Sequence, residues 1–91
     1  MASLAYIQER MAKLKDWGLE MNSIMKEFNF SSFSDALVFV NKVAEIAIKQ
    51  EHHPEILLSF TTVRLTLTTH SEGTLTSKDF DVAEEIDKIV I

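Results

Sequence analysis

Apolar side chains recur every three or four residues in three stretches of the chain, the spacing that places them on one side of an α-helix. The first stretch predicts a helix from about Ser3 to Lys15, which the breaker sequence Asp16-Trp17-Gly18 ends. The apolar stripe of this helix consists of Leu4, Ile7, Met11 and Leu14. Such a stripe is typical of a helix that packs one face on a core.

The second stretch opens with a capping pattern, in which Ser32 precedes Asp35 by three residues just ahead of an apolar run. It predicts a helix that ends near Glu51, because Pro54 forces His53 out of the helical conformation. The stripe expected in the core is Ala36, Leu37, Val40, Val43, Ala44 and Ala47. Burial of these side chains, at roughly 1.5 to 3 kcal/mol each, makes this helix a major part of the core.

The third stretch repeats the capping pattern, with Asp79 three residues after Thr76. It predicts a final helix to about Lys88 or Ile89, preceded by a loop over residues 71–74 that holds Gly73. The apolar positions of this helix are Phe80, Ala83, Ile86 and Val90. A capping role is favoured for Asp79 over a catalytic one.

Alternating and β-branched runs predict four strands. Residues 19–30 suit two short strands around a turn at 21–23, and residues 56–60 and 63–69 suit a hairpin. In the last run one face carries Val63, Leu65, Leu67 and Thr69, and the other carries Arg64, Thr66, Thr68 and His70. The polar face suits solvent, a subunit interface or a pocket wall, and Phe60 is expected in the core. The order α-β-β-α-β-β-α predicts one α+β domain over residues 1–91.

Composition narrows the classes of function. The net charge is -5 and no basic run exists, which argues against a direct nucleic acid partner. The chain has no cysteine, so disulfides, thiolate nucleophiles and cysteine-based zinc sites are excluded. The amphipathic start, residues 1–10, resembles neither a signal peptide nor a membrane span. The default expectation is a cytoplasmic protein with no membrane contact.

All three histidines fall in one short region, with His52 and His53 at a helix exit and His70 after the predicted hairpin. If the hairpin returns beside this exit, the three imidazoles meet in one pocket, where groups that titrate near neutrality suit acid/base chemistry. The alternative is structural, since histidine is favoured at the negative end of a helix and at polar strand ends. A metal site is not expected, because adjacent histidines in an extended chain point to opposite faces.

The spacing of these residues is specific. Phe60 follows the His52-His53-Pro54 sequence by six residues, His70 comes ten later, and Asp79 nine beyond that. With this pattern, residues 17–86 resemble the pterin-4a-carbinolamine dehydratase family. The resemblance implies a four-stranded antiparallel sheet with three helices on one face, assembled as a homodimer or homotetramer.

The resemblance also implies an activity, the loss of water from a 4a-hydroxytetrahydropterin to give the quinonoid dihydropterin, without metal or cofactor. On the family pattern the acid/base and pterin-binding residues are His52, His53 and His70, and the substrate is lined by Pro54, Thr69, Ser71 and Glu72. The assignment of acid and base among the histidines stays open. Ile48 and Ile56 stand where many members carry Glu and Trp. The alternative function is a non-catalytic binding or dimerisation scaffold, related to transcription factors or molybdopterin metabolism.

Overall fold

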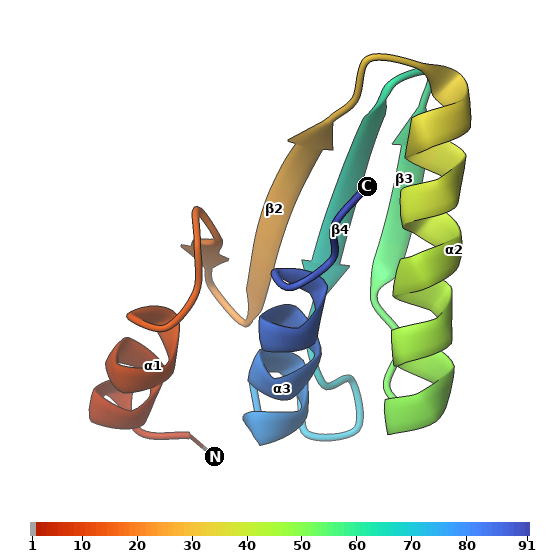
Figure 1. Ribbon diagram of the computed structural model, residues 1–91. Helices are drawn as coiled ribbons and strands as arrows, with labels where there is room; N and C mark the ends of the chain where they lie inside the picture. The colour runs from red at the N-terminus through yellow and green to blue at the C-terminus, as the bar shows by residue number, and fades with distance from the viewer. Residues whose placement is uncertain (1) are drawn as a thin grey trace.

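The computed structural model describes residues 2–91 and confirms the α+β class and the order of elements (Figure 1). Met1, part of the amphipathic start, lies outside the described residues. The elements are α1 (Leu4–Met11), β1 (Gly18–Glu20), β2 (Ser23–Asn29), α2 (Phe33–Gln50), β3 (Glu55–Ser59), β4 (Thr62–Leu67) and α3 (Ser77–Ile86). None of the helices within residues 2–91 is long and apolar enough to cross a membrane.

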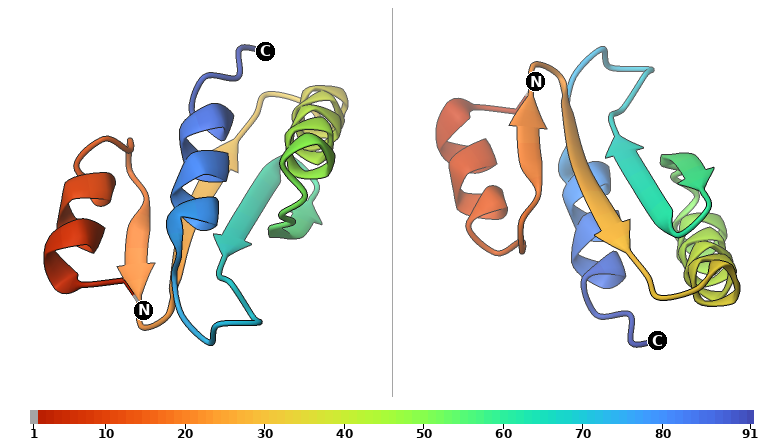
Figure 2. Two further views of the ribbon diagram at one scale, coloured as in Figure 1. Left: turned by 90° about the horizontal axis from the view of Figure 1, so that it is seen from below. Right: turned by 90° about the horizontal axis from the view of Figure 1, so that it is seen from above.

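The four strands form one antiparallel sheet in the order β1-β2-β4-β3, and the register places apolar residues opposite one another. Ile24 pairs with Leu67 and Ile56 pairs with Leu65, so the face that carries these residues is mainly apolar. The exception on this face is Lys26, which pairs with Leu65 and forms an ion pair with Asp87. Figure 2 shows α3 over the middle of this sheet, α2 along β3 and α1 beside β1. The core therefore lies between the sheet and the helices.

The first helix is shorter than predicted and ends at Met11 instead of Lys15. After Ala12 the N–H groups of Lys13 and Leu14 bond carbonyls three residues back, which ends the α-helical pattern. The Lys15 backbone N–H then donates to Asp87 Oδ2 at 3.0 Å, outside any helix. Leu14 still packs on the core from the turn that follows, whereas Leu4 is exposed, contrary to the predicted stripe. Helical spacing alone therefore does not identify which apolar residues of this segment pack on the core.

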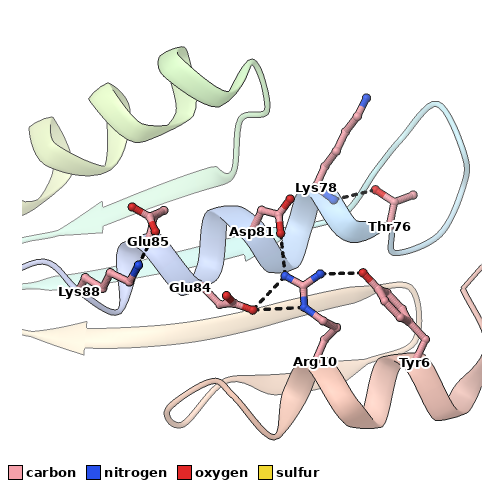
Figure 3. Close-up of polar contacts among 8 residues, drawn as sticks. All are labelled: Tyr6, Arg10, Thr76, Lys78, Asp81, Glu84, Glu85 and Lys88. Atoms are coloured by element: carbon pink, nitrogen blue, oxygen red, sulfur yellow. Dashed lines mark hydrogen bonds and ion pairs between the residues drawn. The ribbon is translucent and has the colours of Figure 1, made fainter.

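Helix α1 is held to α3 by Arg10. Its guanidinium donates to Asp81 Oδ1 at 2.7 Å and to Glu84 Oε2 at 2.9 Å, and also to the Tyr6 hydroxyl (Figure 3). The same group lies 5.3 Å from the centre of the Phe80 ring. Burial works to lower the pKa of Arg10, but the hydrogen bonds to Asp81, Glu84 and Tyr6 outweigh it, so the pKa is raised above its usual value. Arg10 is therefore a fixed cation between the two helices.

The long helix α2 begins as predicted, with the Ser32 hydroxyl accepting the Asp35 N–H. Its buried line differs from the predicted stripe, because Phe39 is buried and Leu37 is 39% exposed. Phe39 packs against Phe28 and Phe30, with ring centres 4.5 Å and 5.0 Å away. These aromatic contacts, with β2 and with the residue after it, lie on the buried face of the helix, which consists of Ala36, Phe39, Val43 and Ala47.

The hairpin of β3 and β4 is present, with bounds that differ from the prediction. Phe60, expected in the core, lies in the turn with φ 53° and a side chain that is 74% exposed. Strand β4 ends at Leu67, so His70 is a turn residue and not the end of a strand. Thr69 forms only an isolated bridge to Thr74, which closes the loop around Gly73 at φ 67°.

Helix α3 begins with the predicted capping box, in which Thr76 and Asp79 satisfy each other's backbone N–H groups. It ends at Ile86, earlier than expected, and Val90 is exposed instead of lying on the apolar face. The end of α2, the end of β4 and the start of α3 all lie at the lower end of the molecule in Figure 1. The candidate histidines follow the first two of these segments, His52 and His53 after α2 and His70 after β4.

Candidate active site

A cavity of about 330 Å³ opens at this end of the sheet. It is lined by Glu51, His52, His53, Thr68, Thr69, His70, Ser71 and Lys78. The volume lies at the lower end of the range usual for small-molecule sites. The structure thus brings together the three histidines and two of the other predicted residues, Thr69 and Ser71.

The end of α2 sets the position of the first histidine. Glu51 adopts the left-handed conformation at φ 54°, which turns the chain out of the helix. The Glu51 N–H then bonds the Ile48 carbonyl, and the His52 N–H bonds the Ala47 carbonyl at 3.0 Å, the pattern of a Schellman motif. His52 is consequently fixed by backbone bonds before its side chain makes any contact.

The His52 side chain is 12% exposed and reaches a fully buried carboxylate, since its Nε2 lies 2.5 Å from Asp79 Oδ1. The other oxygen of Asp79 accepts the Thr76 backbone N–H at 3.0 Å and the Thr69 hydroxyl at 2.8 Å. Asp79 is therefore a cap of α3, as predicted, and at the same time a partner of the pocket. Sequence spacing alone did not reveal the second contact.

His53 and His70 are exposed residues on the pocket wall. Two lining residues, Glu51 and Lys78, were not predicted as part of the site. For a third, Thr68, the sequence left three environments open, namely solvent, a subunit interface and a pocket wall, and the structure places it on the cavity. Lys78 lies between Thr76 and Asp79, the two capping residues of α3. Its place in this first turn, soon after the His70 segment, is the feature of the sequence that could have indicated a pocket residue. Pro54 and Glu72, by contrast, do not line the cavity.

The two departures from the family pattern also lie off the cavity. Ile48 is 69% exposed on α2, and Ile56 faces the helices from β3, partly buried. Neither of them lines the pocket. Among residues 2–91, no group of three or more His, Asp or Glu side chains is arranged to hold a metal ion.

Fold and site together define a class of protein, a small α+β unit with one histidine-lined pocket at the end of an antiparallel sheet. A sequence profile described as "Pterin 4 alpha carbinolamine dehydratase" matches residues 2–89. The chain belongs to this family. It is 46% identical over 88 residues to a Chloroflexus aurantiacus protein named "Putative pterin-4-alpha-carbinolamine dehydratase", covering 97% of this chain and 95% of that one. A protein of the same name from Sulfolobus acidocaldarius is 40% identical, with 91% of each chain covered.

Two solved structures are similar to this chain. A transcriptional coactivator/pterin dehydratase from Brucella melitensis superposes with a TM-score of 0.88 at 31% identity, covering 93% of each chain. A pterin dehydratase-like protein described as a RuBisCO assembly factor in the alpha-carboxysome has a TM-score of 0.64 at 21% identity, covering 81% of this chain and 84% of that one. The second likeness concerns the fold alone.

Proposed function

We propose that this protein is a hydro-lyase that converts a 4a-hydroxytetrahydropterin to the quinonoid dihydropterin by histidine acid/base catalysis, in tetrahydrobiopterin recycling in the cytoplasm. The observation that carries the proposal is that His52, His53 and His70 line the same cavity, in a chain of the pterin carbinolamine dehydratase family. The cavity volume of about 330 Å³ suits a bicyclic ligand.

The reaction needs two proton transfers and no redox step. The bond from C4a to the hydroxyl oxygen breaks, and the hydroxyl takes a proton and leaves as water. The neighbouring ring N–H gives its proton to a base, and the electron pair left on nitrogen forms the new C=N bond. Imidazoles suit both transfers, because their ordinary pKa lies near neutral pH. One histidine of the pocket donates and another accepts.

The test follows the dehydration of the carbinolamine by absorbance with wild type, His53→Ala and Lys49→Ala. Lys49 is an exposed residue of α2 outside the pocket and provides the control. We expect wild type and Lys49→Ala to accelerate the reaction, and His53→Ala to lower kcat by about 100-fold, the usual size of an acid/base contribution. A wild-type rate equal to the uncatalysed rate would remove the enzyme proposal.

A second candidate function is that of a binding or dimerisation scaffold. It is favoured by apolar residues that α2 leaves exposed, Phe33, Leu37, Val38 and Ile48. It also agrees with the name of the Brucella protein, a transcriptional coactivator/pterin dehydratase that is 31% identical to this chain. Both functions are compatible with a homodimer or homotetramer, which we propose as the working form.

A further inference from the structure

Asp79, a carboxylate without any exposed surface, contacts a residue that lines the pocket. Two donors, the Thr76 backbone N–H and the Thr69 hydroxyl, meet Asp79 at Oδ2, at 3.0 Å and 2.8 Å. Thr69 has one hydroxyl hydrogen and gives it to Asp79, so the Thr69 oxygen takes the hydrogen of the Thr76 hydroxyl, 2.8 Å away. Capping thus occupies Oδ2 and leaves Oδ1 free for another partner.

That partner is His52, whose Nε2 lies 2.5 Å from Oδ1. An imidazole nitrogen is more basic than a carboxylate oxygen, so the hydrogen of this bond belongs to Nε2. A neutral His52 then carries its lone pair on Nδ1. The bond to Asp79 therefore selects one of the two tautomers of the ring.

The free nitrogen is accessible. Within residues 2–91, Nδ1 of His52 has no hydrogen-bond partner, and no buried side-chain nitrogen or oxygen is without one. Nδ1 is consequently not buried, and His52 is one of the residues that line the cavity. The lone pair can be reached by a molecule in the pocket.

We propose that Asp79 is a positioning residue that holds His52 as the proton acceptor of the pocket. The inference rests on the proposed dehydration and assigns its roles: Nδ1 of His52 takes the proton of the ring N–H, and His53 or His70 supplies the proton to the leaving hydroxyl. Asp79 itself does not touch the substrate. It fixes the orientation and tautomer of the ring, as the aspartate of a Ser-His-Asp triad does.

Asp79→Asn tests this role with almost no change of shape. The two donors at Oδ2 hold the amide oxygen there, so the amide NH₂ faces Nε2 of His52. Nε2 must then accept, and the ring hydrogen moves to Nδ1, where it removes the lone pair from the pocket. We expect kcat to fall by at least about 100-fold with little change of KM, since the equivalent substitution in a triad acts through the same tautomer change.

Asp35→Asn is the matched control. Asp35 holds the same third position of α2, after its own cap Ser32, at the opposite end of the helix from the pocket (Figure 1). We expect Asp35→Asn to keep the wild-type kcat. Equal losses in the two variants would assign the effect to helix capping and overturn the positioning role.

A spectroscopic readout separates position from stability. ¹⁵N NMR of the ring nitrogens, recorded at a pH where His52 carries one ring hydrogen, is expected to show this hydrogen on Nε2 in wild type and on Nδ1 in Asp79→Asn. Hydrogen on Nδ1 in wild type would overturn the inference even if the variant did not fold. If folded Asp79→Asn has the same kcat as the wild type, the positioning role is overturned but the proposed function stands. If the wild type itself does not accelerate the reaction, the proposed function and the acceptor role of His52 are both removed.

Discussion

At the scale of single residues, Phe60 is the clearest case of local strain. It stands first in the two-residue turn between β3 and β4, with φ 53°, where glycine or asparagine is usual. Its ring is mostly exposed, so packing does not compensate for the left-handed conformation, which is less favourable by roughly 1–2 kcal/mol for a residue with a side chain.

Phe60→Gly is expected to raise the free energy of unfolding by about 0.5–1 kcal/mol, because relief of the strain exceeds the entropy that glycine loses on folding. Urea denaturation followed by circular dichroism measures the change. Ser59→Gly is the control, since Ser59 is an extended strand residue and gains nothing from glycine. It should lower the free energy of unfolding by about 0.5–1 kcal/mol. A decrease for Phe60→Gly would contradict the strain argument.

The same scale shows what the sequence can predict of the site. The positions of His52 and His53 follow from local rules, because Pro54 ends the helix at a definite residue. The contact between His52 and Asp79 does not, since 27 positions separate them and only the packing of α3 on the sheet brings them together. The prediction that Phe60 lies in the core was wrong because it relied on hydrophobicity. The register of β3 and β4 places position 60 in the turn, where the side chain is exposed whatever its type.

At the scale of elements, α1 contacts α3 through the partly buried cation Arg10 and through the Tyr6 ring, which packs on Phe80. Arg10 joins Asp81 and Glu84 of α3, and its side chain is 12% exposed (Figure 3). Glu85 of α3 and Lys88, just beyond the helix, form a second ion pair with side chains that are 44% and 72% exposed. The two pairs thus separate the effect of burial from that of charge.

Arg10→Met is expected to lower the free energy of unfolding by about 1–3 kcal/mol, because it leaves two carboxylates without their hydrogen-bonded partner. Lys88→Met should change it by less than about 0.5 kcal/mol, as exposed pairs contribute little. Thermal or urea unfolding of the two variants checks both values. Equal changes in the free energy of unfolding for the two variants would show that the burial of Arg10 does not strengthen its ion pairs.

The types and order of the elements could be predicted from the sequence, whereas several of their ends could not. Ser32 and Thr76 start their helices through side-chain bonds to residues three positions away or fewer, which a sequence pattern contains. The segment after helix α1 is fixed by Asp87, from the far end of the chain, which accepts the Lys15 N–H. A local sequence pattern cannot predict a bond between residues so far apart in the chain.

At the scale of the whole molecule, the sheet has two open edges. Within residues 2–91, strand β3 pairs only with β4 and strand β1 only with β2. The β3 edge is five residues long and carries Leu57, 57% exposed, while β1 has only three residues. Long apolar edges favour pairing with another chain, so β3 is the edge at which we expect association.

Light scattering at micromolar concentration is expected to give a multiple of the 10.4 kDa chain mass. Leu57→Lys should lower this mass, because a charge on an edge strand opposes pairing. Leu19→Lys, on the short edge β1, is the matched variant and should leave the mass unchanged. A wild-type chain that stays monomeric would remove the expectation of a homodimer or homotetramer.

The carboxylate of Asp79 serves both the first turn of α3 and the ring of His52. Heat or denaturant that frays this turn also releases the imidazole, so activity is expected to be lost before the rest of the chain unfolds. Any attempt to make the protein more heat-resistant by redesigning the beginning of its last helix would therefore act on its chemistry as well.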